Sequence, residues 1–252
     1  FTLTSLFFLY LLYLSIPSLY DSGRVQKALY NNLVEEFDLN LSLSSDITYR
    51  ILPKPHFHIK DSKIFRDKNK APEEIGEIKD VRLFIGQKNF FNKENIKIKE
   101  MVLSRGNFFF NRENYDYIID LLKKDFSTKK IVVKKSKLFF NDKSKTIIFI
   151  YTIDNLNFFK NGKENKQELK TKGEIFKIPI KLNWEKNLTD KNTISNFKAD
   201  KLDIEFVNKG NFFNDLYSYE NNLKILTNSF RTNYKIFEDS IHLESKKSLI
   251  KN

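Results

Sequence analysis

The first sixteen residues, Phe1–Ile16, carry no charged side chain and consist mainly of Phe, Leu, Tyr and Ile. An apolar helix needs roughly 20 residues to cross the hydrocarbon core of a membrane, and the run reaches that length if it continues through Pro17 to Tyr20. Every face of this helix would be apolar, whereas a surface helix of a globular domain has one apolar stripe. The run therefore predicts a single-pass transmembrane anchor over residues 1–20.

A cleaved signal peptide is the main alternative for this segment, and a buried core helix is a weaker one. Signal peptides have a shorter apolar core and end at a small-x-small cleavage site. Ser15, Ser18 and Ser22 are the nearest small residues, and the segment has no Ala-x-Ala sequence. The chain begins at Phe1 rather than Met, so we expect further residues upstream. Either membrane interpretation places the bulk of the chain outside the cytosol.

The composition of the remaining chain limits the classes of protein that it fits. About 230 residues suffice for one sizeable core or two smaller ones. With 0 Cys the chain has neither disulfides nor thiolate metal sites. The net charge of +12 comes from 44 Lys and Arg against 32 Asp and Glu, and the two signs are interspersed. This pattern does not favour a nucleic-acid partner, and a membrane-anchored basic protein meets anionic lipid first.

Two periodicities follow the anchor. Val25, Leu29, Leu33 and Phe37 recur every four residues, which predicts an amphipathic helix that starts after a cap at residues 21–23 and packs against the domain. From Leu39 onward apolar and polar residues alternate in short runs, which is typical of antiparallel strands with one apolar face. We expect strands near residues 39–43, 47–51, 56–60, 81–83, 96–103, 130–133, 138–140, 146–151, 176–184 and 202–206.

The predicted fold class is therefore mainly β (α+β), with a curved antiparallel sheet after the two N-terminal helices. One further helix is expected after a cap at Asn111, with its apolar residues on one face: Tyr115, Ile118, Ile119, Leu122 and Phe126. A polar loop is expected at residues 67–74 and a turn at residues 104–106. Pro179 places its strand at an edge or a bulge, because proline cannot donate to a strand ladder. Weak alternation continues to Leu249 without a terminal element, so we expect the domain to extend beyond residue 252.

The sequence contains little that indicates catalysis. His56 and His58 lie two residues apart, so they share one face of a strand and form the best candidate for a metal site. The alternative is a solvent-facing strand end, which we favour, since the third histidine, His242, is distant in sequence. No nucleophile elbow, zinc-protease motif or cysteine nucleophile is present. We therefore expect no enzyme activity, no cofactor and no bound metal.

The order of the N-terminal parts resembles the AsmA family, whose members have a membrane helix, an amphipathic helix, a strand, a Pro-x-Pro turn and an alternating strand. These parts correspond here to residues 1–16, 25–37, 39–51, 53–56 and 57–61. Residues 96–110 resemble the next strand of the family, although Gly106 and Asn107 replace a frequent proline. The family's Gly-x-Asn-Trp sequence is also replaced, by residues 111–126. Residues 173–180 resemble a later strand.

The resemblance implies a bacterial inner-membrane protein with a single span and a periplasmic β-rich domain over residues 21–252, linked to outer-membrane biogenesis. Larger relatives such as TamB are thought to conduct lipids along an apolar groove, which implies phospholipid as a partner, together with envelope proteins. An open β-trough would offer eight candidate groove residues: Phe176, Ile178, Ile180, Leu182, Trp184, Leu202, Ile204 and Phe206. The alternative is a membrane-anchored scaffold that binds proteins, with these residues in a closed core.

Overall fold

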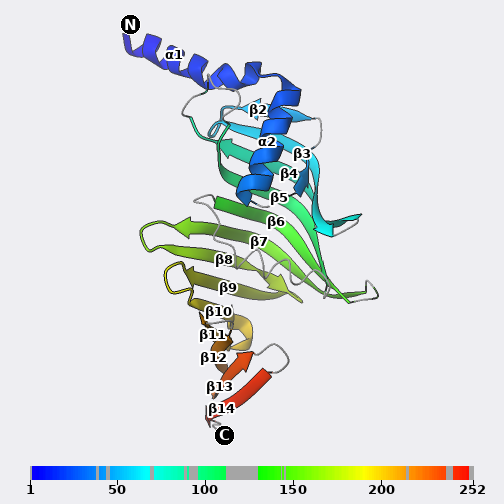
Figure 1. Ribbon diagram of the computed structural model, residues 1–252, viewed down its shortest axis with the longest axis vertical. Helices are drawn as coiled ribbons and strands as arrows, with labels where there is room; N and C mark the ends of the chain where they lie inside the picture. The colour runs from blue at the N-terminus through cyan, green and yellow to red at the C-terminus, as the bar shows by residue number, and fades with distance from the viewer. Residues whose placement is uncertain are drawn as a thin grey trace. The chain divides into compact units, whose positions relative to one another are not determined.

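The computed structural model confirms a mainly β fold with two helices at its N-terminus (Figure 1). It describes residues 2–37, 40–43, 46–68, 71–87, 90, 96–111, 130–142, 144, 146–213, 216–236 and 241–249. These residues form two compact units, unit 1 over Phe1–Ile148 and unit 2 over Phe149–Asn252. The strands of both units belong to one 14-stranded sheet, and the two units differ in how the apolar face of their strands is covered.

The N-terminal apolar run is helical, but the helix is shorter than the predicted span. Helix α1 (Thr2–Ser15) passes into a 3-10 turn, η1 (Ile16–Leu19), because Pro17 lacks the N–H that a longer helix would need. Within the described residues, no single helix combines the length and hydropathy of a membrane span. Only the pair Leu3–Leu19 and Ser22–Glu35, bent by 89°, does so together.

The predicted amphipathic helix is confirmed as α2 (Ser22–Phe37). Asp21 caps it, because its Oδ1 accepts a hydrogen bond of 2.9 Å from the backbone N–H of Arg24. Val25, Leu29 and Leu33 are buried, as their spacing predicts. The helix therefore packs against the domain through its apolar stripe.

The strands of unit 1 follow the order β1-β3-β4-β5-β6 within this sheet, and β2 pairs with β3 beside β1. All pairs are antiparallel except β5 and β6, which are parallel. A parallel pair needs a long crossover; the predicted second helix falls in this connection, at residues 112–129, outside the described residues. The strands are β1 (Asn40–Ser42), β2 (Ile47–Arg50), β3 (His56–Lys68), β4 (Ala71–Ile85), β5 (Ile98–Asn111) and β6 (Lys130–Asn141).

Two local predictions for unit 1 are wrong. The expected loop at residues 67–74 is largely the facing ends of β3 and β4, and the expected turn at residues 104–106 lies inside β5. Asn111 ends β5, and the helix that it was predicted to cap falls at residues outside those that the structure describes. Arg105 has a positive φ of 56°, as do Asp61 at 48° on β3 and Lys135 at 48° on β6. Positive φ gives each strand a local irregularity without ending its pairing, which a turn-like sequence cannot distinguish from a turn.

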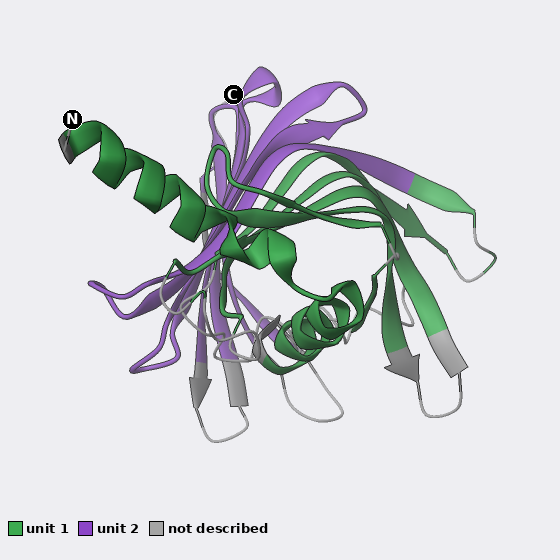
Figure 2. Ribbon diagram, turned by 90° about the horizontal axis from the view of Figure 1, so that it is seen from above, with its two compact units in different colours: residues 1–148 green, residues 149–252 purple. Residues whose placement is uncertain are grey.

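Helix α2 lies on the inner side of the curved strands of unit 1 (Figure 2). The core beneath it is well excluded from water: the largest side chains there are no more than 2% exposed. These are Leu29, Leu33, Leu41, Phe57, Ile59, Ile78, Val81, Leu83, Ile98 and Met101. Unit 1 is therefore a two-layer structure in which a helix closes the apolar face of a sheet.

The sheet of unit 2 is a meander in which every strand pairs antiparallel with the next. Its strands are β7 (Ile147–Asn161), β8 (Lys166–Ile175), β9 (Ile178–Asn187), β10 (Thr193–Ala199), β11 (Ile204–Phe213), β12 (Leu216–Ile225), β13 (Asn228–Ile236) and β14 (Ile241–Leu249). Among the described residues of unit 2, the one helical segment is the turn η2 (Asp200–Leu202). The prediction that Pro179 places its strand at an edge or a bulge is wrong, because β9 pairs with β8 on one side and β10 on the other without a register shift. The proline is tolerated because it lies beyond the part of β9 that pairs with β10.

Candidate functional site

A continuous row of apolar side chains crosses five neighbouring strands of unit 2. The row takes one residue from each of the strands β9 to β13, and the strand register places each residue directly opposite the next: Leu182, Phe197, Phe206, Leu223 and Phe230. Residues paired in this way point to the same face of an antiparallel sheet. All five are half-buried. We call this set the apolar row.

Two further rows flank the apolar row on the same face. On one side Ile204 lies opposite both Ala199 and Ile225, which extends the apolar surface. On the other side the register aligns Trp184, Ser195, Asn208, Asn221 and Thr232. We call this second set the polar row. The structure describes all positions of the three rows on β10–β13. None of these positions carries a charged side chain.

The polar row is held by hydrogen bonds between its own side chains. Asn208 Nδ2 donates to Asn221 Oδ1 at 2.6 Å, and Asn221 Nδ2 donates to Thr232 Oγ1 at 3.5 Å. Asn208 Nδ2 also lies 3.4 Å from the hydroxyl of Tyr234. Interstrand amide bonds of this kind fix the register of the strands. The row therefore offers oriented, uncharged polar groups along one border of the apolar row.

Aromatic packing continues the face beyond the polar row. Tyr219 and Tyr234 stack with ring centroids 4.7 Å apart. Gly210 lies opposite Tyr219, and a Cβ added there would meet the Tyr219 ring at 2.5 Å. Glycine is needed at this position because the ring occupies the space of a side chain.

The opposite face of the same strands is strongly charged. Its side chains on β10–β13 include Lys198, Glu205, Lys209, Glu220, Lys224, Arg231 and Lys235. Lys198 Nζ lies 2.9 Å from Glu205 Oε1; the hydrogen bond and charge of Glu205 raise the pKa of the lysine. The pKa of Glu205 is lowered in turn, first by its hydrogen bond to Lys198. This face is therefore suited to water, and the sheet is amphipathic.

The structure places the eight predicted groove residues unequally. Leu182 and Phe206 belong to the apolar row, with Ile180 and Ile204 one step along their strands, and Trp184 borders the row. Ile178 lies at the start of β9 opposite Ile175. Their role in binding lipid stays a prediction.

Two of the eight are not on a strand. Phe176 is 74% exposed in the two-residue turn between β8 and β9, where it and Lys177 have φ of 51° and 63°. A tight hairpin needs positive φ at both central residues, so the turn interrupts the alternation that predicted a strand. Leu202 is 45% exposed in η2. The prediction that Phe176 and Leu202 lie on strands is therefore wrong.

Sequence reasoning missed Phe197, Leu223 and Phe230, three of the five residues in the apolar row. Each is an isolated apolar residue among polar ones in its strand, as in the sequence Asn221-Asn222-Leu223-Lys224. Only the register between successive strands brings them into line. A repeated spacing of single apolar residues between turn signals is the one signal that could have found them.

The two histidines on β3 are buried rather than solvent-facing, so the preferred interpretation of a wet strand end is wrong. His58 Nε2 lies 3.1 Å from Asp80 Oδ1, and His56 Nδ1 lies 2.7 Å from the carbonyl oxygen of Lys54. Arg105 Nε donates to Asp80 Oδ2 at 2.7 Å. Among the described residues, no group of three or more His, Asp and Glu side chains has metal-binding geometry. These histidines serve the packing of unit 1.

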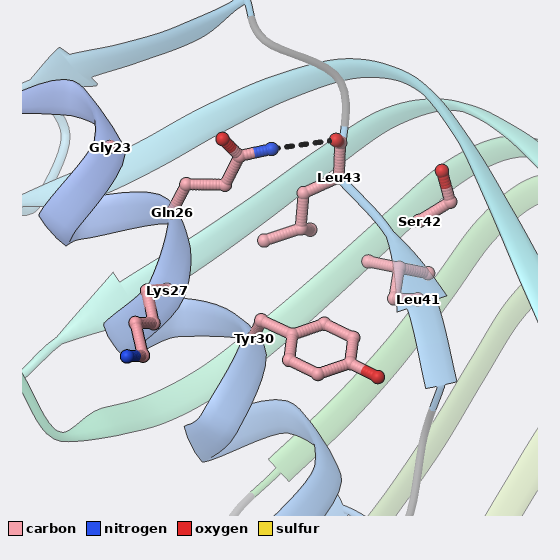
Figure 3. Close-up of a pocket in the computed structure, with 7 residues that line it drawn as sticks. All are labelled: Gly23, Gln26, Lys27, Tyr30, Leu41, Ser42 and Leu43. Atoms are coloured by element: carbon pink, nitrogen blue, oxygen red, sulfur yellow. Dashed lines mark hydrogen bonds between the residues drawn. The ribbon is translucent and has the colours of Figure 1, made fainter.

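A pocket of about 400 Å³ lies between α2 and β1 in unit 1 (Figure 3). Its polar side chains are engaged locally: Gln26 Nε2 donates to the carbonyl oxygen of Leu43 at 3.1 Å, and Tyr30 donates to Asn40 Oδ1 at 3.2 Å. Lys27 is the one charged residue in its lining, among the residues described. The pocket therefore lacks the convergent titratable groups that general acid–base chemistry needs.

No protein-family model matches this chain, and no curated protein sequence matches it significantly. The function must therefore be argued from the geometry, and the apolar row of unit 2 is its most distinctive feature.

Proposed function

We propose that the chain is a membrane-anchored, non-enzymatic lipid-binding protein, in which the apolar row of unit 2 shields phospholipid acyl chains from water. The observation that carries this proposal is the row itself: five partly exposed apolar residues in line across the strands, bordered by an uncharged polar row. A contiguous apolar surface that stays accessible to water is typical of a binding site. A row without charges suits hydrocarbon better than an acidic or basic ligand.

The length of the row fits an acyl chain. From β9 to β13 there are four interstrand spacings of about 4.8 Å, so the row extends about 19 Å. The hydrocarbon core of a bilayer is about 30 Å thick, so the acyl chains of one leaflet reach about 15 Å. A chain of this length lying across the strands would thus contact most of the row. Each 100 Å² of apolar surface removed from water contributes about 2.5 kcal/mol.

The polar row favours a lipid with polar groups next to its acyl chains. Asn208, Asn221 and Thr232 are neutral side chains with donors and acceptors, and they run parallel to the apolar row. The ester region of a phospholipid, which joins tails to headgroup, matches that change from apolar to neutral polar surface. The charged headgroup would then lie beyond the two rows, in water.

The cellular setting that we propose follows from the resemblance to the AsmA family and from α1. An inner-membrane anchor would hold the bulk of the chain in the periplasm, where lipid binding would serve outer-membrane biogenesis. The apolar side chains at the N-terminal end of α1 are exposed, which supports burial in lipid. Neither a cofactor nor nucleic acid enters this function, and envelope proteins are its expected partners.

A protein-binding scaffold is the second candidate, and one observation favours it. Among the described strands, β14 pairs only with β13, so its outer edge has backbone groups that a partner strand could pair with. In this case a protein segment would cover the apolar row and no lipid would bind.

Photocrosslinking from matched positions separates the two candidates. Phe206 and its neighbour Val207, on the opposite face, are each replaced by p-benzoylphenylalanine in the full chain, expressed in bacteria. We expect a phospholipid adduct from position 206 and little from position 207, as identified by mass spectrometry. A protein adduct at position 206 without lipid would favour the scaffold. Equal lipid labelling at both positions would contradict the proposed site.

A further inference from the structure

Helix α1 is fixed to unit 1 by tyrosine hydroxyls rather than joined by a flexible tether. Tyr13 donates to the carbonyl oxygen of Gln87 at 2.6 Å, and Tyr10 donates to the side-chain oxygen of Gln87 at 3.2 Å. Tyr49 on β2 donates to the carbonyl oxygen of Leu14 at 2.6 Å, and Tyr20 donates to that of Phe90. We call these four tyrosines the tyrosine collar.

Aromatic packing strengthens this attachment. The rings of Tyr13 and Phe90 stack with centroids 5.2 Å apart and planes inclined by 22°, and Phe90 is buried. The link from α1 to α2 is the short turn η1, which leaves little freedom between the two helices. The direction of α1 is therefore set by unit 1.

The collar lies where the exposure of α1 decreases toward unit 1. The five large apolar side chains before it are 61–83% exposed and lie on all sides of the helix: Leu3, Leu6, Phe7, Phe8 and Leu9. Beyond Tyr10, Leu12 is still 53% exposed, whereas Leu14 is only 5% exposed. Tyrosine is enriched at the level where a membrane meets water, with its ring in the apolar region and its hydroxyl outside.

The segments next to the collar carry an exposed apolar tip and an excess of cations. The backbone N–H of Ile85 donates to the carbonyl oxygen of Pro55 at 3.1 Å, which holds the loop of residues 51–55 beside the strand that leads to Gln87. In this loop Leu52 is 79% exposed. Gly86 N–H donates to the carbonyl oxygen of Lys97 at 2.9 Å and brings a third segment to the same end.

The charge of this end is positive. Arg50, Lys54, Lys97 and Lys99 are exposed here. In the described residues 50–55, 85–87 and 96–100, the one carboxylate is that of Glu100, which lies 3.7 Å from Lys130 Nζ. Each Lys or Arg near an anionic membrane surface contributes about fivefold to binding.

We propose that this end of unit 1 is a membrane seat: the tyrosine collar, Leu52 and the four cations rest on an anionic lipid bilayer and set the depth and direction of α1. The inference rests on the proposed insertion of α1. A bilayer fits better than a protein partner because the apolar surface of α1 is continuous around the helix and leads directly into the aromatic and basic groups. Leu52 would enter the headgroup region while its cations contact lipid phosphates.

The 0 Cys of the chain make single labelling sites straightforward. In the full chain, Leu6→Cys reports on α1, Leu52→Cys on the seat, and Lys163→Cys, in an exposed turn of unit 2, serves as control. Each is labelled with an environment-sensitive fluorophore and reconstituted in vesicles of 3:1 phosphatidylcholine and phosphatidylglycerol. We expect deep quenchers to reach position 6, shallow quenchers to reach position 52, and neither to reach position 163.

The outcomes separate the seat from the anchor. If position 6 is buried in lipid while position 52 stays in water, the seat is wrong and the anchor stands. If both stay in water, the proposed insertion fails as well. Replacing Lys54 and Lys97 by Ser should weaken the equilibrium binding of position 52 to the vesicle surface by about fivefold for each charge removed. This weakening should vanish in pure phosphatidylcholine, and an unchanged equilibrium in anionic vesicles would overturn the role of the cations.

Discussion

The two units contain similar amphipathic strands but treat their apolar faces differently. In unit 1 the stripe of α2 lies over the sheet, and residues such as Phe57, Ile59 and Leu83 are almost fully excluded from water. In unit 2 the described residues provide no helix beyond η2, and the apolar row stays half-exposed. Covering a large apolar side chain contributes about 1.5–3 kcal/mol. Unit 1 uses this free energy for folding, and in unit 2 it is available for a ligand.

The charged side chains of the two units also differ in how far they are exposed to water. In unit 1 the carboxylate of Asp80 lies between His58 and Arg105, with most of its surface removed from water. In unit 2 the pair of Lys198 and Glu205 lies on the charged, water-facing side of β10 and β11, whereas Glu168, which pairs with Lys170, is buried. Asp80 thus stabilises the interior of unit 1, whereas on β10–β13 of unit 2 the charges keep one face in water and leave the face of the apolar row uncharged.

The largest expected effect is a difference in lost stability between a buried leucine of unit 1 and a partly exposed leucine of unit 2. Leu29→Ala removes a fully buried side chain and leaves a cavity, so we expect it to destabilise unit 1 by about 2–5 kcal/mol. Leu223→Ala, in the half-exposed apolar row, should cost about 1 kcal/mol or less. Urea denaturation followed by circular dichroism measures both. Equal losses would mean that the apolar row is packed as tightly as the core of unit 1.

Local periodicity explains what the sequence could predict. The spacing of Val25, Leu29 and Leu33 depends on one helix alone, and the alternation from Ile178 to Trp184 depends on one strand. Both were predicted and both are present. The mainly β class followed from the same local signal repeated along the chain.

The features that could not be predicted depend on the pairing of one strand with another or on unusual backbone angles. The parallel pairing of β5 with β6 is set by a connection of many residues, and the apolar row needs the register of five strands. Phe176 and Arg105 adopt positive φ although neither is glycine, so nothing in their identity separates a turn from a strand irregularity. Burial of His58 follows from Asp80, which lies on another strand.

The second effect concerns the buried charge of unit 1 and depends on pH. Burial acts to raise the pKa of Asp80, but hydrogen bonds and positive charge from Arg105 and His58 outweigh it and hold this pKa below its usual value. Its stabilising contribution is thus complete above the ordinary pKa of about 4 and is lost as the pH falls through the folded value. Asp80→Asn should cost about 1–3 kcal/mol at pH 7.

The pH profile supplies the control for this second prediction. The stability of the wild type and of Asp80→Asn should converge as the pH falls below 4, as measured by urea denaturation between pH 7 and pH 2.5. Asp61→Asn keeps a side chain that tolerates the positive φ at this site and alters only an exposed pair with Lys79. It should leave the midpoint unchanged. A constant difference between Asp80→Asn and wild type at all pH values would contradict the assigned role.

The smallest effect tests how well the uncovered face of unit 2 is ordered. A Cβ at Gly210 would lie 2.5 Å from the ring of Tyr219 and 2.6 Å from Thr193 Oγ1, so Gly210→Ala must displace the ring and weaken its stack on Tyr234. Because side chains can move more easily than backbone, we expect a loss of about 1 kcal/mol. Gly162→Ala is the matched control, since nothing lies within 4 Å of its Cβ position. Thermal unfolding compares the two variants. If Gly210→Ala lowers the stability no more than Gly162→Ala does, the aromatic end of this face is loosely packed. The rows beside it would then lack the fixed geometry that alignment of an acyl chain requires.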